Sequence, residues 1–248
     1  MPRRQQNTDI DIENIDYQNT ETIKKMQQNT DIDYQNTETM QKRINIFLDL
    51  DQTIISGEVL KDEDDDDEIY DIESNKTKAI NFNFHNMENY YVIFERPGLQ
   101  KFLDYLFKNF NVSIWTAASK DYGIFIAEKF ILKGHPERKL DFMFFSYHCD
   151  LSDKIGKGTK DLSILWNYYK IPGYNENNTY IVDDYDHVFD TQQHNTIIAP
   201  PFRFNDKDSE NDNFLPELVN RLKGLRKEMM AGDNRHSIGI INDGNEHK

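Results

Sequence analysis

One stretch near the start of the chain constrains the fold more than any other, because an apolar run leads straight into two carboxylates. Residues 44–48 are apolar except for one asparagine, which is typical of a strand buried inside a parallel sheet. Asp49 and Asp51 follow, and both point to the same side because side chains alternate along an extended chain. Open α/β sheets bind ligands at the carboxyl edge of their strands. The sequence therefore predicts paired carboxylates at a binding edge.

Two carboxylates in such a position repel each other unless a cation or a proton offsets their charge. Mg²⁺ takes one or two protein carboxylates together with water and phosphate oxygens, so the pair suits this ion. A hydroxyl follows at Thr53 and completes the pattern Asp-x-Asp-x-Thr. The pattern alone is only moderately specific, since an acidic strand end can also arise by chance.

Hydrophobic spacing in the rest of the chain predicts strands that alternate with helices. The predicted strands cover residues 112–116, 142–145, 179–184 and 196–198, and the predicted helices about 97–110, 120–133, 160–169 and 213–230. Pro97 suits the first position of the first helix. Alternation at Ile80, Phe82 and Phe84 adds a short hairpin before that helix. This order favours a parallel, doubly wound α/β sheet.

Polar side chains stand at the ends of further predicted strands. Thr116 ends one strand, Asp183 and Asp184 end another, and Lys160 opens the helix between them. In order and residue type, these positions and the Asp-x-Asp-x-Thr stretch resemble the four motifs of the haloacid dehalogenase superfamily of phosphotransferases. Each position alone has a plainer reading, such as a strand-end cap, a turn residue or a surface lysine. Four such coincidences in the correct order are not expected.

Within that superfamily, the chain resembles most the branch of protein serine phosphatases that act on the RNA polymerase II C-terminal domain, which carry an NLI interacting factor-like domain. The resemblance covers roughly residues 44–230. The motifs that carry it are Arg96-Pro97-Gly98, Trp115-Thr116-Ala117-Ala118 followed by Tyr122, Lys160-Asp161-Leu162-Ser163, Ile181-Val182-Asp183-Asp184, and the closing Asn195…Pro201-Phe202…Leu215-Pro216-Glu217-Leu218. It implies a Rossmann-like three-layer α/β fold with a central parallel sheet and a small insertion after the first strand.

The resemblance also implies the roles of four catalytic residues. Asp49 would attack phosphorus in line and form an aspartyl-phosphate, which splits one hard hydrolysis into two steps. Asp51 would protonate the departing serine oxygen and later activate water. Thr116 would hydrogen-bond a phosphoryl oxygen, and Lys160 would offset the charge on the phosphate and on Asp49.

The same resemblance implies a magnesium site and three substrate-binding residues. Asp49, the backbone carbonyl of Asp51 and Asp184 would hold Mg²⁺, with Asp183 beside it. The expected substrate-binding residues are Thr53, Arg96 and Tyr122. Arg96 could equally be a structural ion-pair partner, and Tyr122 could be a core residue.

The net charge of −15 is concentrated in an acidic insertion at about residues 56–91, which holds eleven acids and three bases. Residues 92–230 hold twenty acids and eighteen bases and are therefore nearly neutral. Direct nucleic-acid binding needs a basic surface, so we do not expect it. The run Asp62–Glu68 within the insertion is typical of a solvated loop.

The chain divides into three parts. Residues 1–43 are rich in Asn, Gln, Asp and Thr, and the eight residues from Ile15 to Thr22 recur from Ile32 to Thr39. Such a segment cannot bury a core, so we expect a disordered low-complexity extension, with a weak partner-binding helix as the alternative. Residues 44–230 would form the phosphatase domain, and residues 231–248 a flexible tail.

Several features bear on the setting of the protein. A single cysteine, Cys149, excludes an internal disulfide and fits a reducing compartment, so we expect an intracellular protein of the nucleus or cytoplasm. No stretch is long and apolar enough to cross a membrane, and no membrane partner is expected. We expect a monomer. The composition suggests an AT-rich genome, such as that of a protist or of a large DNA virus acting in its host cell.

The favoured function is a Mg²⁺-dependent protein serine/threonine phosphatase acting on the RNA polymerase II C-terminal domain or a similar Ser-Pro phosphopeptide. Four aromatic residues, Phe82, Phe84, Tyr90 and Tyr91, could supply an apolar pocket for the proline. Residues 147–157, interpreted as a loop, lack an arginine that some members of the branch use near the peptide. The alternatives are a phosphatase of another phosphoprotein or small phosphate ester, and a non-catalytic interaction scaffold.

Overall fold

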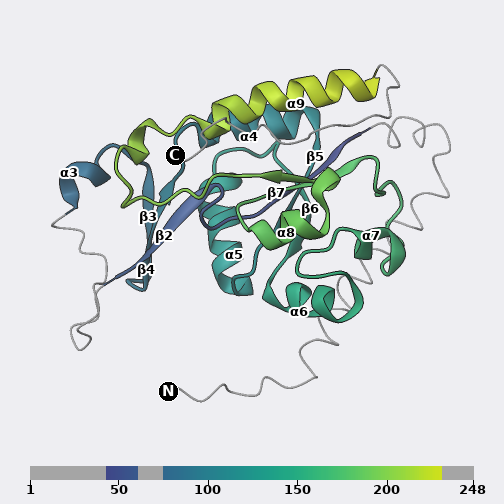
Figure 1. Ribbon diagram of the computed structural model, residues 1–248. Coiled ribbons are helices and arrows are strands. Elements are labelled where there is room, and N and C mark those ends of the chain that lie inside the picture. The colour runs from purple at the N-terminus through teal and green to yellow at the C-terminus, as the bar shows by residue number, and fades with distance from the viewer. Residues whose placement is uncertain (1–42, 61–74, 231–248) are drawn as a thin grey trace, which may run out of the picture.

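The computed structural model describes residues 43–60 and 75–230 (Figure 1). The predictions of a disordered N-terminal extension, a solvated acidic run and a flexible tail fall mainly on residues outside these ranges. None of the helices in the described ranges is long and apolar enough to cross a membrane.

A five-stranded sheet forms the centre of the molecule, and all of its strands run parallel. The order across the sheet is β6-β5-β1-β7-β8. The strands are β1 (Asn45–Leu48), β5 (Asn111–Trp115), β6 (Leu140–Phe144), β7 (Thr179–Asp183) and β8 (Thr196–Ile198). The predicted α/β fold with a central parallel sheet is therefore confirmed.

Helices cover both faces of this sheet and make it the middle of three layers (Figure 1). The alternation within β1 explains the two cores, since Ile46 and Leu48 pack on one face and Phe47 packs on the other. The first face is covered by α4 (Leu99–Asn109), α5 (Lys120–Ile126), the π-helix η1 (Ala127–Ile131) and α9 (Phe214–Met230). The second face is covered by α6 (Ser146–Ile155), α7 (Ser163–Asn167) and α8 (Asp186–Thr191).

A small antiparallel sheet forms the insertion after β1, and Figure 1 shows it beside the large sheet. Its order is β2 (Ile55–Val59), β4 (Tyr91–Glu95) and β3 (Phe84–Met87). The predicted hairpin is present as β3 and β4, but it begins later than expected. Residues 76–79 form the short helix α3 (Lys76–Ala79), Ile80 is 81% exposed, and Phe82 belongs to an aromatic core with Phe94 and Phe204.

Two helix boundaries differ from the sequence predictions because glycine and turn geometry intervene. The helix predicted from Pro97 begins at Leu99, since Gly98 adopts a left-handed conformation at its N-cap with φ of 85°. The helix predicted from Lys160 begins at Ser163 as α7, and Lys160 itself lies in a turn with φ of 55°.

The loop expected at residues 147–157 is wrong, since most of this segment is helical. It forms α6, which buries His148, Cys149 and Ser152. Most of the other residues of this helix are polar. So few apolar positions leave no clear helical spacing in the sequence. Cys149 is a buried free thiol, as expected of a core residue, and burial raises its pKa to about 11.

Two short 3₁₀ helices complete the described elements. These are η2 (Gln193–Asn195), which leads into β8, and η3 (Ser209–Asn211), which precedes α9.

Candidate active site

The carboxyl edge of the large sheet brings together residues that lie far apart in the sequence. Strand β1 lies between β5 and β7, with Leu48 in register with Ile114 on one side and Val182 on the other. The chain segments that continue beyond these three strands therefore leave the sheet at the same edge. These segments carry Asp49 and Asp51, Thr116 and Asp184, and Asp183 is the last residue of β7.

Lys160 links two of these strand ends. Its ammonium nitrogen Nζ donates to Asp49 Oδ1 at 2.5 Å and to Asp183 Oδ2 at 2.7 Å. All three side chains are nearly inaccessible to solvent, at 5% exposure for Lys160, 7% for Asp49 and 1% for Asp183. A buried lysine with two carboxylate partners is fixed as a point charge beside both acids.

The environment keeps Lys160 protonated. Burial disfavours its ammonium form, but Asp49 and Asp183 outweigh burial, and the pKa of Lys160 lies above its usual value. Burial and then the charge of Asp49 raise the pKa of Asp183, while Lys160 opposes this rise.

Side chains that the sequence did not single out hold the Lys160 turn. Gln192 Nε2 donates to the carbonyl of Lys160 at 2.8 Å, and Gln192 Oε1 accepts from the amide of Leu162 at 3.0 Å. Ser152 Oγ accepts from the amide of Asp161 at 2.8 Å and donates to the carbonyl of Gly158 at 2.6 Å. These contacts join α6 and α8 to the turn, and no local sequence pattern signals them.

Asp51 has a different partner from Asp49. The hydroxyl of Tyr122 donates to Asp51 Oδ1 at 2.5 Å. Burial raises the pKa of Asp51 to about 6, while the bond from Tyr122 opposes this rise and the nearby Asp49 adds to it. Burial and the charge of Asp51 together raise the pKa of Tyr122, so its hydroxyl remains the donor.

Gly57 makes room for this contact. A Cβ atom at position 57 would lie 2.6 Å from the hydroxyl oxygen of Tyr122 and 3.4 Å from Asp51 Oδ1. Any larger residue at this position would push the hydroxyl away from the carboxylate. Strand β2 therefore contributes a glycine to the environment of Asp51, and no motif in the sequence signals this glycine.

Two hydroxyl groups complete the edge. Thr53 Oγ1 donates to Asp184 Oδ1 at 3.3 Å, so this threonine orients one of the paired acids. Thr116 is 1% exposed, and its Oγ1 accepts from the amide of Ala118 at 3.1 Å. That bond leaves the O–H of Thr116 as a donor toward a ligand at the strand end.

Arg96 is placed as a structural residue. It is fully buried, and its Nε and Nη2 donate to the two carboxylate oxygens of Asp212, each at 2.8 Å. Its Nη1 donates to the carbonyl of Thr53 at 2.8 Å. These contacts favour the ion-pair alternative, because the guanidinium faces the protein, and substrate binding by Arg96 stays a prediction.

The acids of this edge fit a divalent cation of the Mg²⁺ type. Carboxylate oxygens of Asp49, Asp183 and Asp184 lie within 4.8 Å of one another. These three acids share the ammonium group of Lys160, which contacts Asp49 and Asp183, so negative charge is in excess at the cluster. Hard oxygen donors around such an excess are the ligands that Mg²⁺ prefers.

The arrangement suits transfer of a phosphoryl group. Asp49 is held by a cation and Asp51, two residues on, by a neutral hydroxyl, so one carboxylate can act as a nucleophile and the other can carry a proton. Of the residues predicted from the sequence, the structure gathers Asp49, Asp51, Thr53, Thr116, Tyr122, Lys160, Asp183 and Asp184 at this edge and leaves out Arg96.

Comparisons of the sequence with known proteins give consistent results. Residues 44–233 match the NLI interacting factor-like phosphatase family. The sequence is 47% identical over 177 residues to CTD phosphatase-like protein 355R of Invertebrate iridescent virus 6, covering 70% of this chain and 94% of that protein. It is 39% identical over 190 residues to the protein of the same name from Invertebrate iridescent virus 3, covering 75% of this chain and 98% of that protein.

A comparison of structures finds similarity to Fcp1, an essential RNA polymerase II CTD phosphatase, with a TM-score of 0.46 and 19% sequence identity. The match covers 82% of this chain and 55% of the Fcp1 chain, so this chain spans little more than half of that length.

Proposed function

The chain belongs to the NLI interacting factor-like phosphatase family, and from that premise we propose that it is a Mg²⁺-dependent protein serine/threonine phosphatase. The observation that carries this proposal is the pairing of Lys160 with Asp49, next to an Asp51 that Tyr122 holds by a hydrogen bond. These contacts give the two carboxylates the separate environments that a nucleophile and a proton carrier need.

In the first step, a carboxylate oxygen of Asp49 attacks the phosphorus of a phosphoserine in line with the bond to the serine oxygen. The new bond joins Asp49 to phosphorus, and the bond between phosphorus and the serine oxygen breaks. Asp51, whose pKa is raised to about 6, gives its proton to the departing oxygen. Lys160 and Thr116 stabilise the charge on the phosphoryl oxygens.

In the second step, water attacks the phosphorus of the aspartyl-phosphate. Asp51, now a carboxylate, takes the proton from this water, and the bond between Asp49 and phosphorus breaks. Inorganic phosphate leaves, and both carboxylates return to their starting states. The hydroxyl of Tyr122 keeps Asp51 in the same position for both proton transfers.

Mg²⁺ would be held by Asp49, the backbone carbonyl of Asp51 and Asp184, with Asp183 beside it. When bound, the ion supplies positive charge that offsets the repulsion between the carboxylate nucleophile and the phosphate.

The proposed substrate is phosphoserine next to proline in the RNA polymerase II C-terminal domain or a similar phosphopeptide. The names of the viral relatives and the motifs of the sequence support this substrate class. Tyr91 is 37% exposed, and its ring contacts that of Tyr122 edge to face at 5.5 Å between centroids. This aromatic surface beside Asp51 suits an apolar residue that adjoins the phosphoserine.

Release of inorganic phosphate tests the function most simply. We expect the full chain to hydrolyse phosphoserine-proline peptides in the presence of Mg²⁺ and to lose this activity with a chelator. Asp49→Asn should abolish the reaction, because it removes the nucleophile without changing the size of the side chain.

The substrates separate the alternatives. Hydrolysis of an aryl phosphate but of no peptide would support the proposed phosphatase reaction and contradict the proposed peptide substrate. No release from any substrate, with folded protein and Mg²⁺ present, would favour the interaction scaffold.

The relatives from iridescent viruses support an origin in a large DNA virus, and we propose that the protein acts inside the host cell as a monomer.

A further inference from the structure

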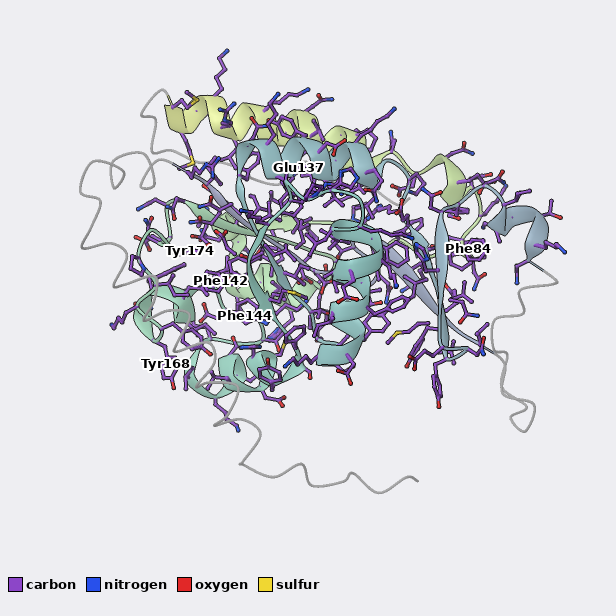
Figure 2. All side chains as sticks on the ribbon, turned by 180° about the vertical axis from the view of Figure 1, so that it is seen from behind. Phe84, Glu137, Phe142, Phe144, Tyr168 and Tyr174 are labelled. Carbon is purple, nitrogen blue, oxygen red and sulfur yellow. The ribbon has the colours of Figure 1, made fainter. Side chains whose placement is uncertain are left out.

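A cavity of about 500 Å³ opens away from the catalytic residues, between the β3–β4 hairpin and the end of η1. Phe84 and His85 of β3, Glu95 of β4 and Phe130 of η1 line it. Phe84 is 42% exposed, and Figure 2 labels it on the small sheet. No residue of this lining belongs to the proposed catalytic set.

Positive charge gathers at the cavity. Lys129 and Lys133 line it together with His85, and both lysines are exposed. Among the described residues, no carboxylate lies within ion-pair distance of either lysine. Burial lowers the pKa of His85, and the charges of Lys133 and Lys129 lower it further. Lys129 and Lys133 therefore bring two ammonium groups to the cavity that have no carboxylate partner among the described residues, whereas His135, which also lines it, lies 3.1 Å from a carboxylate oxygen of Glu137.

Glu95 is the one acid in this lining, and it does not neutralise the lysines. Its Oε2 accepts from Asn83 Nδ2 at 3.2 Å, and its Oε1 accepts from Gln100 Nε2 at 2.8 Å. Burial raises the pKa of Glu95. This side chain is therefore part of the cavity wall, bonded to neutral amides.

The walls also offer aromatic surface. The ring of His85 meets that of Phe130 edge to face with 4.9 Å between centroids. Phe84 contacts Phe94 of the neighbouring strand at 5.5 Å between centroids, which fixes its ring on the small sheet. A ligand for this cavity would combine negative charge with an apolar part.

Part of the cavity wall lies on the face of the small sheet that reaches the catalytic edge, because His85 and Glu95 are on that face, whereas Phe84 is opposite Phe94 and lies on the other face. Tyr91 and Glu95 share a face of β4, and Tyr91 contacts Tyr122 beside Asp51. Four residues of strand at about 3.3 Å each separate Tyr91 from Glu95 by about 13 Å. Along α5 and η1, eight residues at about 1.5 Å each separate Tyr122 from Phe130 by about 12 Å. The two paths give the same separation.

We propose that this cavity binds a second phosphoryl group on the same phosphopeptide whose first phosphoserine is hydrolysed at Asp49. The proposal rests on the proposed function, since it concerns the substrate of that site. An extended peptide advances about 3.3 Å per residue, so a spacing of about four residues between the two phosphorylated side chains matches the separation of Tyr91 from Glu95.

A phosphoryl group fits this cavity better than a carboxylate does. It carries about 1.5 to 2 negative charges at neutral pH, which suits two lysines, whereas a carboxylate carries one. Lysine ammonium groups bind phosphate oxygens as compact point charges. The rings of Phe84 and Phe130 can pack against the residue next to the phosphoserine.

Steady-state kinetics of the full chain test the proposal. The variant is Lys129→Ala/Lys133→Ala, and the matched control is Lys108→Ala/Lys227→Ala, which removes the same charge from exposed positions on α4 and α9. The substrates are a singly phosphorylated peptide, peptides with a second phosphoserine four residues before or after the first, and the same peptides with glutamate at the second position.

We expect the cavity variant to raise KM about tenfold for one of the doubly phosphorylated peptides, with kcat unchanged, because it removes binding that is equal in ground and transition states. KM for the singly phosphorylated peptide and turnover of an aryl phosphate should not change. An equal rise in KM for the control variant would overturn the proposal, because bulk charge would then explain the effect. An equal effect on the glutamate peptides would overturn the assignment of a phosphoryl ligand.

A binding measurement keeps this proposal separate from the proposed function. In the Asp49→Asn background, fluorescence anisotropy should show tighter binding of a doubly phosphorylated peptide than of the singly phosphorylated one, and Lys129→Ala/Lys133→Ala should remove the difference. Equal binding of both peptides would overturn the second site. The predicted binding pattern without phosphate release by the wild type would support the site and contradict the phosphatase.

Discussion

Asp49 and Asp51 lie two residues apart, yet their surroundings give them different chemical properties. Asp49 contacts the ammonium group of Lys160, whereas Asp51 accepts a hydrogen bond from the neutral hydroxyl of Tyr122. A pair of acids in unequal environments is the usual basis for dividing nucleophilic and proton-transfer roles. The hydroxyl of Tyr122 thus has a specific place in the proposed mechanism as a positioning group for Asp51.

Tyr122→Phe tests this positioning role. We expect kcat to fall about tenfold for an alkyl phosphate such as phosphoserine, because a misplaced acid transfers its proton poorly to a leaving group that needs it. The loss should be twofold or less for p-nitrophenyl phosphate, whose leaving group departs without a proton. Steady-state rates on both substrates measure the difference, and equal losses on the two would contradict the role.

A second substitution checks the same contact without removing the hydroxyl. Gly57→Ala should reproduce the pattern of Tyr122→Phe, since the added methyl group would lie 2.6 Å from the Tyr122 hydroxyl oxygen. The matched control is Gly224→Ala, where an added Cβ meets no atom within 4 Å. Normal kinetics in Gly57→Ala would show that the contact is not needed.

The raised pKa of Asp51 also predicts a pH-dependent stability. In the folded protein this pKa is about 6, whereas an aspartate in an unfolded chain has its ordinary pKa of 3.8. Folding therefore favours the protonated form of Asp51. The stability that this protonated acid contributes to the fold is fully present below pH 3.8 and is lost as the pH rises through about 6. Without metal, Asp51→Asn should thus raise the free energy of unfolding by about 1 kcal/mol at pH 7.5, after allowance for partial exposure.

Denaturant unfolding of both proteins at several pH values measures this effect. The difference between Asp51→Asn and wild type should shrink as the pH falls from 7.5 toward 4. A difference that stays constant over this range, or that grows at low pH, would contradict the assigned environment of Asp51.

Between elements, Arg96 shows a connection that no local pattern in the sequence could reveal. It lies after β4 and joins the backbone at Thr53 to Asp212, which is 116 residues away and just before α9. Phe214 lies against the guanidinium group at 4.4 Å from its ring centroid. The ion pair thus connects the catalytic turn, the small sheet and the last helix.

Arg96→Lys separates a structural role from a substrate-binding role. Lysine keeps the charge but cannot bond both oxygens of Asp212 and the carbonyl of Thr53. We expect the free energy of unfolding to fall by about 2 kcal/mol, since buried bonds to charged groups are lost. KM for a phosphopeptide should stay within twofold of the wild type. A large rise in KM without loss of stability would restore Arg96 to the substrate-binding set.

The Lys160 turn shows why some boundaries could not be read from the sequence. The lysine itself was identified by its place before Asp161-Leu162-Ser163, yet the helix begins only at Ser163. Its left-handed backbone is held by bonds from Gln192, which directly follows α8, and from Ser152 of α6. Long-range contacts of this kind override local helix propensity. The loop expected over residues 147–157 is wrong for another reason, because α6 has too few apolar positions to show helical spacing.

For the molecule as a whole, the sequence was sufficient to predict those strands whose apolar residues lead directly into the proposed catalytic side chains. Apolar runs that end in acids or a hydroxyl predicted β1, β5 and β7 and the edge that they share. The small sheet was harder to predict, because β2 shortly precedes an acidic run, and the sequence of that run is typical of a solvated loop. That sheet brings Gly57 to the catalytic edge and also carries one wall of the cavity that Lys129 and Lys133 line.

The central claim is that Asp49 becomes covalently phosphorylated during turnover. Rapid acid quenching of the full chain with Mg²⁺ and a radiolabelled phosphoserine-proline peptide tests it most directly. We predict a burst of label on the protein that hydroxylamine removes, that peptide mapping places at Asp49, and that Asp49→Asn abolishes. Phosphate release without any protein-bound label, or an equal amount of label in Asp49→Asn, would contradict the account.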